Sequence, residues 1–455
     1  MHQRVLMLNL GGYDLHGSIS PAVGNLSFLR ILELSNNSFR GKIPQEVGLL
    51  VQLQTLRLGN NSLTGEIPTN LTGCSKLESI DLSSNNFIGK LPNEIGSLRM
   101  LRDFSIVTNK IEGQIPPSIG NLSSLSYLVL GDNKLEGHIP QEIGHLRKLI
   151  FLDLYSNKLS GMLPSTLYNM SSLITFSASV NQFNGSLPSN IFHTLPNLQE
   201  FDIGGNQVSG PIPTSITNAS VLRVFDITGS HFVGKFPNVG KLCDLRLKMQ
   251  KLELGGNKLS GEISPFIGNL SQLFFLYLGD NMLEGNIPPS LRKCQKLQYL
   301  NLSQNNLIGT IPSEVFSLFS LTSMDLSQNL LSGNLPGEVG RLKNIEELDV
   351  SKNYLSGEIL GTIGECMSLE YLNLQGNSFH GTIPSSLASL RGLRGLDLSQ
   401  NDFSGSIPEG LQDISTLEYL NVSSNMLDGE VPTEGIFRNA SRFAMSGNRK
   451  LCAGC

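Results

Sequence analysis

The amino-acid sequence predicts an α/β repeat solenoid, in which about 18 coils of 24 residues stack so that one short strand from each joins a parallel β-sheet on the concave side. Three observations predict this fold class. An asparagine recurs every 24 residues, the residues before it alternate between apolar and polar, and a glycine recurs after it, followed in most coils by proline. A fixed period lets the core grow with repeat number, so the 455 residues need no division into separate globular domains.

The recurring asparagines set the register of the coils. They are spaced by 24 residues from Asn37 to Asn181, the next slots hold Asn206 and Ser230, and the series resumes at Asn257. We expect each side-chain amide to bond turn backbone groups that no sheet pairs, which is a structural role. These ladder asparagines are Asn37, Asn61, Asn85, Asn109, Asn133, Asn157, Asn181, Asn206, Asn257, Asn281, Asn305, Asn329, Asn353, Asn377, Asn401 and Asn425.

The segment before each ladder asparagine has the alternation of a strand. In residues 297–302, Leu300 and Leu302 should point inward, while Tyr299 and Asn301 should face out. After the asparagine comes L-x-G-x-I-P, as in LTGEIP at 63–68, whose glycine suits a positive φ. The stretch that follows, such as residues 119–125, predicts a short helical or 3₁₀ return segment on the convex side.

The consensus L-x-x-L-x-L-x-x-N-x-L-x-G-x-I-P-x-x-I-G-x-L resembles the plant-specific leucine-rich repeat, found in the ectodomains of plant leucine-rich-repeat receptor kinases. Residues 8–48 and 434–454 resemble the subgroup of the plant flagellin and elongation-factor receptors and the rice bacterial-resistance receptors. The resemblance implies a leucine-rich-repeat superhelix on the extracellular face of the plasma membrane. It also implies a peptide or protein ligand on the concave face, in immune or developmental signalling, and a co-receptor ectodomain near the C-terminal repeats.

The chain departs from that family pattern in several places. We expect a solenoid over residues 1–434 without its N-terminal cap, and a truncated C-terminal cap over 435–455, where the pairing of Cys452 and Cys455 stays open. The register slips at 231–251, through either a deletion of repeat material or an irregular loop. The sequence shows no signal peptide, membrane span or kinase signature. We therefore expect that this segment neither inserts into a membrane nor acts as an enzyme.

Composition and motifs argue against several other functions. The chain has 33 Lys and Arg against 38 Asp and Glu, without a polybasic block, so nucleic acid is not an expected partner. No catalytic, metal-binding or nucleotide-binding motif occurs and the seven histidines are dispersed, so we expect no cofactor and no metal. Three cysteines occupy a slot that leucine fills in other coils, which predicts small buried hydrophobic residues: Cys74, Cys294 and Cys366.

Binding should use the outward strand positions, because their backbone is already ordered. Repeats five to eight and twelve depart most from the consensus there, and we expect ligand contacts at Asp103, Tyr127, Val129, Phe151, Asp153, Tyr155, Ser177, Phe275, Tyr277 and Tyr299. The same face carries acidic residues that favour a basic ligand: Asp81, Asp153, Asp202, Asp226, Glu253, Asp325, Asp349 and Asp397. The resemblance places co-receptor contacts at Asn373, Gln375, Asp397, Gln400 and Asn421.

Glycosylation triplets are frequent and suggest an extracellular surface, although the repeat consensus itself creates some of them. They begin at Asn25, Asn36, Asn60, Asn70, Asn121, Asn169, Asn184, Asn218, Asn269, Asn301, Asn421 and Asn439. Two alternatives to a receptor fragment stay open: a secreted leucine-rich-repeat inhibitor of microbial wall-degrading enzymes, and a non-functional truncated receptor product.

Overall fold

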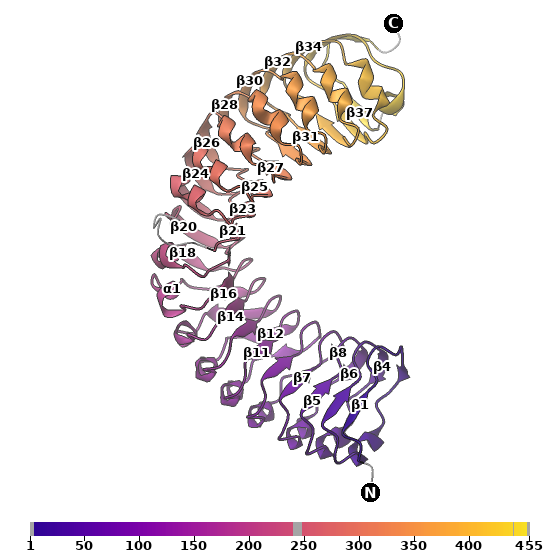
Figure 1. The fold of residues 1–455 in the computed structure, drawn as a ribbon, viewed down its shortest axis with the longest axis vertical. Coiled ribbons are helices and arrows are strands. Elements are labelled where there is room, and N and C mark those ends of the chain that lie inside the picture. The colour runs from indigo at the N-terminus through magenta and orange to yellow at the C-terminus, as the bar shows by residue number, and fades with distance from the viewer. Residues whose placement is uncertain (1–3, 240–247, 440, 453–455) are drawn as a thin grey trace. The chain divides into compact units, whose positions relative to one another are not determined.

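The structure is a computed structural model that describes residues 4–239, 248–439 and 441–452. The chain forms two compact units, the first Met1–Ser215 with Gly229–His231 and the second Ile216–Thr228 with Phe232–Cys455. Within each unit the coils stack in sequence order (Figure 1). None of the helices in these ranges is long and apolar enough to cross a bilayer.

The main sheet of each unit consists of three-residue strands in parallel register, which confirms the predicted fold class. In the first unit the main-sheet strands are β1 (Met7–Asn9), β3 (Ile31–Glu33), β5 (Thr55–Arg57), β7 (Ser79–Asp81), β9 (Asp103–Ser105), β11 (Tyr127–Val129), β13 (Phe151–Asp153), β15 (Thr175–Ser177) and β17 (Glu200–Asp202). In the second unit they are β19 (Val224–Asp226), β21 (Lys251–Glu253), β23 (Phe275–Tyr277), β25 (Tyr299–Asn301), β27 (Ser323–Asp325), β29 (Glu347–Asp349), β31 (Tyr371–Asn373), β33 (Gly395–Asp397), β35 (Tyr419–Asn421) and the shorter β37 (Phe443–Ala444).

A second series of strands follows the ladder position of each coil and also pairs in parallel. These flank strands are β2 (His16–Gly17), β4 (Ser38–Gly41), β6 (Ser62–Gly65), β8 (Asn86–Phe87), β10 (Glu112–Gly113), β12 (Lys134–Gly137), β14 (Lys158–Met162), β16 (Gln182–Asn184), β18 (Ser209–Pro211), β20 (His231–Lys235), β22 (Lys258–Glu262), β24 (Met282–Asn286), β26 (Asn306–Gly309), β28 (Leu330–Asn334), β30 (Tyr354–Glu358), β32 (Ser378–Thr382), β34 (Asp402–Gly405), β36 (Met426–Glu430) and β38 (Lys450–Cys452).

The return segments are 3₁₀ turns and one short α-helix, as the sequence predicts. They are η1 (Pro21–Asn25), η2 (Gln45–Leu49), η3 (Thr69–Gly73), η4 (Asn93–Ser97), η5 (Pro117–Asn121), η6 (Gln141–His145), η7 (Leu167–Asn169), α1 (Ile191–Thr194), η8 (Thr214–Asn218), η9 (Pro265–Asn269), η10 (Pro289–Lys293), η11 (Ser313–Ser317), η12 (Gly337–Arg341), η13 (Gly361–Glu365), η14 (Ser385–Ser389), η15 (Glu409–Asp413) and η16 (Gly435–Arg438).

The ladder asparagines tie each coil to the one before it. The Asn305 amide nitrogen donates to the carbonyl oxygens of Leu278 at 3.0 Å, Leu302 at 3.2 Å and Ser303 at 3.0 Å. Its side-chain oxygen accepts from the Leu283 N–H at 2.9 Å. Since Leu278 and Leu283 belong to the preceding coil, one buried side chain satisfies backbone groups of two coils.

The residue immediately before the ladder asparagine adopts a left-handed conformation in most coils, with φ near +55°. Asn36, Asn60 and Asp132 occupy this position, and asparagine and aspartate tolerate it well. Val180 also occupies it, with φ 55°, although a β-branched side chain is strained there. This turn ends the main-sheet strand and limits it to three residues.

Two glycine positions permit the close stacking of coils. Gly65, in the L-x-G motif, has φ +83°, which confirms the positive φ predicted for this motif. Gly120, in a return segment, has an ordinary φ, but an added Cβ would lie 2.4 Å from the carbonyl oxygen of Glu142 in the next coil. The backbones of successive return segments therefore approach too closely for any side chain at that position.

The irregular stretch at 231–251 forms part of one longer coil. β19 pairs directly with β21, so that Val224 lies beside Lys251, 27 residues later instead of 24. Residues 240–247 fall outside the described part of the chain. The extra residues fall between the end of β20 and the start of β21, and the main-sheet pairing of β19 with β21 is regular.

Residues 435–452 continue the stack as a further coil. β37 pairs with β35, and β38 pairs with β36. Asn448 acts as a ladder residue, since its amide donates to the Val422 carbonyl at 2.8 Å and its oxygen accepts from the Leu427 N–H at 3.0 Å. The sequence pattern missed this coil because Phe443 and Met445 stand where the strand of other coils has leucines. Cys455, one half of the proposed cysteine pair, lies outside the described residues.

Candidate ligand-binding face

Each main-sheet strand turns its first and third residues outward, and the parallel register places equivalent residues of successive strands side by side. We call these the first row and the second row. From β25 to β35 the first row is Tyr299, Ser323, Glu347, Tyr371, Gly395 and Tyr419, and the second row is Asn301, Asp325, Asp349, Asn373, Asp397 and Asn421.

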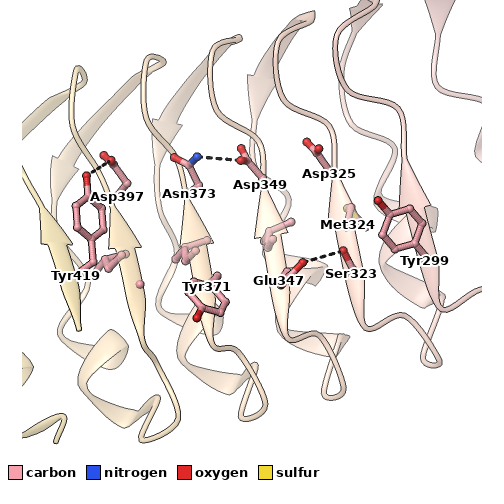
Figure 2. A pocket seen from close by; sticks show the side chains of 14 residues that line it. Tyr299, Ser323, Met324, Asp325, Glu347, Asp349, Tyr371, Asn373, Asp397 and Tyr419 are labelled. Carbon is pink, nitrogen blue, oxygen red and sulfur yellow. Dashed lines mark hydrogen bonds between the residues drawn. The ribbon is translucent and has the colours of Figure 1, made fainter. Parts of the chain in front are cut away.

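A hollow of about 430 Å³ opens on this face of the second unit. Figure 2 shows residues of its walls: the second-row side chains lie in a row, the Tyr419 hydroxyl meets Asp397, and the Tyr371 ring extends away from that row. It spans six strands, and we call it the β25–β35 hollow. Its lining residues are Tyr299, Ser323, Met324, Asp325, Glu347, Leu348, Asp349, Tyr371, Leu372, Asn373, Gly395, Leu396, Asp397 and Tyr419.

Three tyrosine rings border the hollow, and local contacts orient each of them. The Tyr299 ring stacks on Phe275, with centroids 4.2 Å apart and planes 4° apart. Tyr371 leans across Gly395, where an added Cβ would lie 2.8 Å from the ring. The Tyr419 hydroxyl donates to Asp397 at 3.0 Å. A glycine in the first row thus makes room for the neighbouring ring.

The second-row carboxylates are fixed by neutral donors. One oxygen of Asp349 accepts from the Ser351 N–H at 2.8 Å, and the other accepts from the Asn373 amide at 2.9 Å. Asp325 has the same arrangement, with the Ser327 N–H and the Asn301 amide both at 3.0 Å. The side chains are therefore held outward by turn and cross-strand hydrogen bonds while their negative charge is retained.

The charge of the hollow is strongly negative. Burial and the charge of neighbouring Asp325 raise the pKa of Asp349. Hydrogen bonds from Ser351 and Asn373 lower this pKa, but the net change is upward. Among the described residues that line the hollow, none is lysine, arginine or histidine. Arg394, just before β33, pairs with Glu370 at 3.7 Å and with Glu418 at 3.2 Å. Arg394 is thus already shared between two carboxylates that do not line the hollow.

The first unit carries the outward residues that the sequence predicts on β9 to β15. Tyr127 is 44% exposed, and its ring lies 6.0 Å from that of Phe151. Asp153 accepts from the Tyr155 N–H at 2.9 Å, and burial raises its pKa. Ser177 donates to Asp202 at 3.2 Å. These side chains lie on adjacent strands and form a mixed aromatic and polar surface.

A second, shallower hollow of about 700 Å³ lies on the first unit around Arg57. Arg57 pairs with Glu33 at 3.6 Å, and Asp81 and Asp103 line the same space. Asp103, whose pKa burial raises, is the predicted ligand residue that borders it. The other predicted residues of β11 to β15 lie beyond this hollow.

Sequence reasoning identified part of the β25–β35 hollow. Tyr299 was predicted as a ligand residue, and Asn373 and Asp397 as co-receptor contacts; the structure brings all three to the hollow. The sequence pattern missed Tyr371 and Tyr419. The late coils look alike over the segment that begins at the second leucine, as in LNLSQN, but the first-row residue lies just before that leucine. Tyrosine at that position in three of six successive strands was the available signal.

The remaining predicted residues lie around these features. Phe275 and Tyr277 lie on β23, where Tyr277 leans over Gly255. Val129 lies in the second row of β11. Asn421 donates to Asp397 at 3.1 Å, Gln375 follows Asn373 in the turn, and Gln400 is exposed at the left-handed position.

The glycosylation triplets differ in exposure. Asn301 is buried, with 8% of its surface exposed, and Asn421 and Asn269 are half-buried. The side chain of Asn218 lies outside the described part. Eight asparagines of these triplets are exposed, namely Asn25, Asn36, Asn60, Asn70, Asn121, Asn169, Asn184 and Asn439.

Sequence-family comparison gives the class of the fold. Leucine-rich-repeat models match residues 28–50, 124–146, 148–170, 197–219 and 248–270 singly, 51–95 and 271–315 as two copies, and 295–355 and 367–427 as longer arrays. A 36-residue segment, 8% of the chain, is 64% identical to the LRR receptor-like serine/threonine-protein kinase EFR of Arabidopsis thaliana, and covers 4% of that protein.

Solved structures extend the similarity over the whole chain. The plant peptide hormone receptor RGFR1, in complex with RGF2, is 32% identical, with a TM-score of 0.87; the alignment covers 98% of this chain and 79% of that one. The Arabidopsis receptor kinase HAESA, in complex with the peptide hormone IDA and the co-receptor SERK1, is 31% identical, with a TM-score of 0.74, covering 96% and 81%. The chain therefore belongs to the family of leucine-rich-repeat ectodomains of plant receptor kinases.

Proposed function

We propose that the chain is the ligand-binding ectodomain, or a fragment of it, of a plant cell-surface receptor kinase, and that it binds a peptide or protein along the outward face of its main sheet. The observation that carries the proposal is the β25–β35 hollow, where oriented aromatic rings and carboxylates line one preformed surface. Two relatives with the same fold are bound to peptide hormones.

The finer parts of the proposal follow from the family. The chain lies on the extracellular face of the plasma membrane and acts in immune or developmental signalling. A co-receptor ectodomain docks near β31 to β35, as the complex of HAESA with SERK1 suggests. Asn373 and Asp397 border the hollow, so the ligand and the co-receptor would lie next to each other there.

The proposal is tested by attaching glycans to the sheet face. Thr175→Asn completes a glycosylation triplet with Ser177 on β15, and Asp325→Asn completes one with Ser327 on β27. Asp413→Asn completes a triplet with Ser415 on the exposed return segment η15 and serves as the matched control. Mass spectrometry verifies that each glycan is attached.

The probe is a displayed library of random dodecapeptides selected on the unmodified chain. We expect selected peptides to lose binding to one or both sheet-face variants and to keep binding to the Asp413 control. Binding that is equal on all three variants would refute the proposal. If a glycan prevents secretion, Thr175→Arg and Glu347→Arg replace the glycan variants. Thr175 is a half-buried and Glu347 an exposed first-row residue, and binding to each variant is again compared with binding to the Asp413 control.

A further inference from the structure

We propose that the β25–β35 hollow binds the basic side chains of an extended peptide segment, with arginine as the preferred residue at two positions three or four residues apart. This inference rests on the proposed function and adds the chemistry of the ligand.

Within the described part of the chain, no salt bridge neutralises the carboxylates that line the hollow. Asp325, Glu347, Asp349 and Asp397 line the hollow, and their hydrogen-bond partners are serine, asparagine and tyrosine groups, all neutral. Glu370 and Glu418, just outside, share Arg394. Neutral donors orient a carboxylate without cancelling its charge, so a cationic side chain of the ligand gains a favourable interaction with several acids at once.

The carboxylates also keep hydrogen-bonding capacity. An ionised carboxylate offers about four lone-pair sites, and one hydrogen bond to each oxygen leaves about two of them. Asp325 and Asp349 occupy adjacent strands, which lie about 4.8 Å apart. The planar guanidinium carries five N–H donors in a fixed fork, so it can bond both acids, whereas an ammonium group acts as a single point charge.

The tyrosines favour the same ligand group. Tyr371 and Tyr419 lie in the first row beside the acidic second row, and both rings are held by their neighbours. Tyr371 is 44% exposed and Tyr419 45%, which leaves ring surface open to a ligand. A guanidinium stacks on an aromatic face while its edge bonds a carboxylate, so rings and acids side by side match the two chemical features of arginine.

The dimensions set the length and spacing of the segment. From β25 to β35 there are five steps between strands, or about 24 Å, which corresponds to about seven residues of extended peptide at roughly 3.3 Å each. The midpoint of Asp325 and Asp349 lies two and a half steps from Asp397, or about 12 Å, which an extended chain spans in three to four residues. The second basic side chain therefore comes beside Asp397. The oxygens of Asp397 already accept hydrogen bonds from Ser399, Tyr419 and Asn421, so the attraction there is between charges.

The test uses a defined probe and the full chain. The probe is the fluorescently labelled peptide acetyl-Ala-Arg-Ala-Ala-Ala-Arg-Ala-amide, and its comparison carries neutral citrulline in place of both arginines. Binding is measured by fluorescence anisotropy. We expect the arginine peptide to bind at least about tenfold more tightly than the citrulline peptide, with an affinity that falls as salt rises.

Variants separate the hollow from the general negative charge of the chain. Asp325→Ser with Asp349→Ser should weaken the arginine peptide about tenfold, as should Tyr371→Leu. Serine is chosen because asparagine would create glycosylation triplets with Ser327 and Ser351. The matched controls are Glu262→Ser with Glu284→Ser, exposed neighbours on flank strands β22 and β24, and Tyr354→Leu, on flank strand β30; both should bind within about twofold of the unmodified chain.

Each outcome decides one question. Equal binding of the two peptides, or equal weakening by the Glu262 and Glu284 control, would overturn the inference. If sheet-face glycans block the library-selected peptides while the Asp325 and Asp349 variant leaves their binding unchanged, the proposed function stands and this inference fails. If the library-selected peptides bind the sheet-face glycan variants as tightly as the unmodified chain, the proposed function fails, however tightly the arginine peptide binds.

Discussion

Replacing a ladder asparagine should destabilise two coils at once, and Asn305 in the second unit is the clearest case. Its four hydrogen bonds are buried, and two of them join groups of the preceding coil, the Leu278 carbonyl and the Leu283 N–H. Asn305→Ala removes all four. At about 1 kcal/mol of net stability for each bond, the expected cost is about 4 kcal/mol.

An isosteric variant tests the direction of these bonds. Asn305→Asp keeps an acceptor for the Leu283 N–H but directs a carboxylate oxygen at three carbonyl oxygens. Burial and these oxygens raise the pKa of the introduced carboxyl, so its protonated form is the better tolerated. Stability should therefore be higher below the unfolded-state pKa of about 4 and should fall as pH rises through the raised folded-state pKa.

The assay must report on single coils, because a solenoid need not unfold as one unit. Hydrogen exchange followed by mass spectrometry should show faster exchange at peptides covering Leu283 in Asn305→Ala, while coils near Asn61 stay unchanged. Asn306→Ala, at an exposed neighbouring position, is the control. Unchanged exchange at Leu283, together with an unchanged urea midpoint, would refute the structural role assigned to the ladder.

Three further predictions concern backbone strain, thiol reactivity and glycosylation. Val180→Asn should raise stability by about 1 kcal/mol in urea unfolding, because asparagine tolerates a φ of 55°; a loss of stability would contradict the strain. Mass spectrometry of secreted protein should find glycan at exposed Asn121 and none at buried Asn301, and a glycan on Asn301 in folded protein would contradict the placement of β25. Burial raises the pKa of the Cys74, Cys294 and Cys366 thiols to about 11, 12 and 11. A thiol reagent at pH 8 should therefore label these three cysteines only after denaturation.

Those cysteines also show where pattern reasoning succeeds. Each occupies a leucine slot in the repeat, which predicts burial, and the structure buries all three. Their thiols lie 3.1, 3.5 and 3.3 Å from carbonyl oxygens of the preceding coil. The hydrogen-bonding partner could not be predicted, because it depends on how closely one return segment approaches the next.

The binding face was predicted less completely. The period identified which residues of each strand face outward, and Tyr299, which the sequence predicts as a ligand contact, lies at the border of the hollow. Tyr371 and Tyr419 were missed, although they occupy the equivalent position. The role of Gly395, which makes room for the ring of Tyr371, appears only when two strands are seen side by side. Such a relation joins residues 24 apart, and no single repeat contains it.

By itself the sequence determined the coil length, the strand and turn of each coil, and the residues that point inward or outward. These follow from periodicity, since a 24-residue repeat with leucines at fixed offsets can bury them only by stacking coils. The tertiary structure alone decided that residues 435–452 form another coil, that the long coil at 231–251 keeps β19 and β21 paired, and where the face is hollowed. The physical reason is that a hollow depends on side chains from neighbouring coils, whose sizes and tilts vary independently of the repeat.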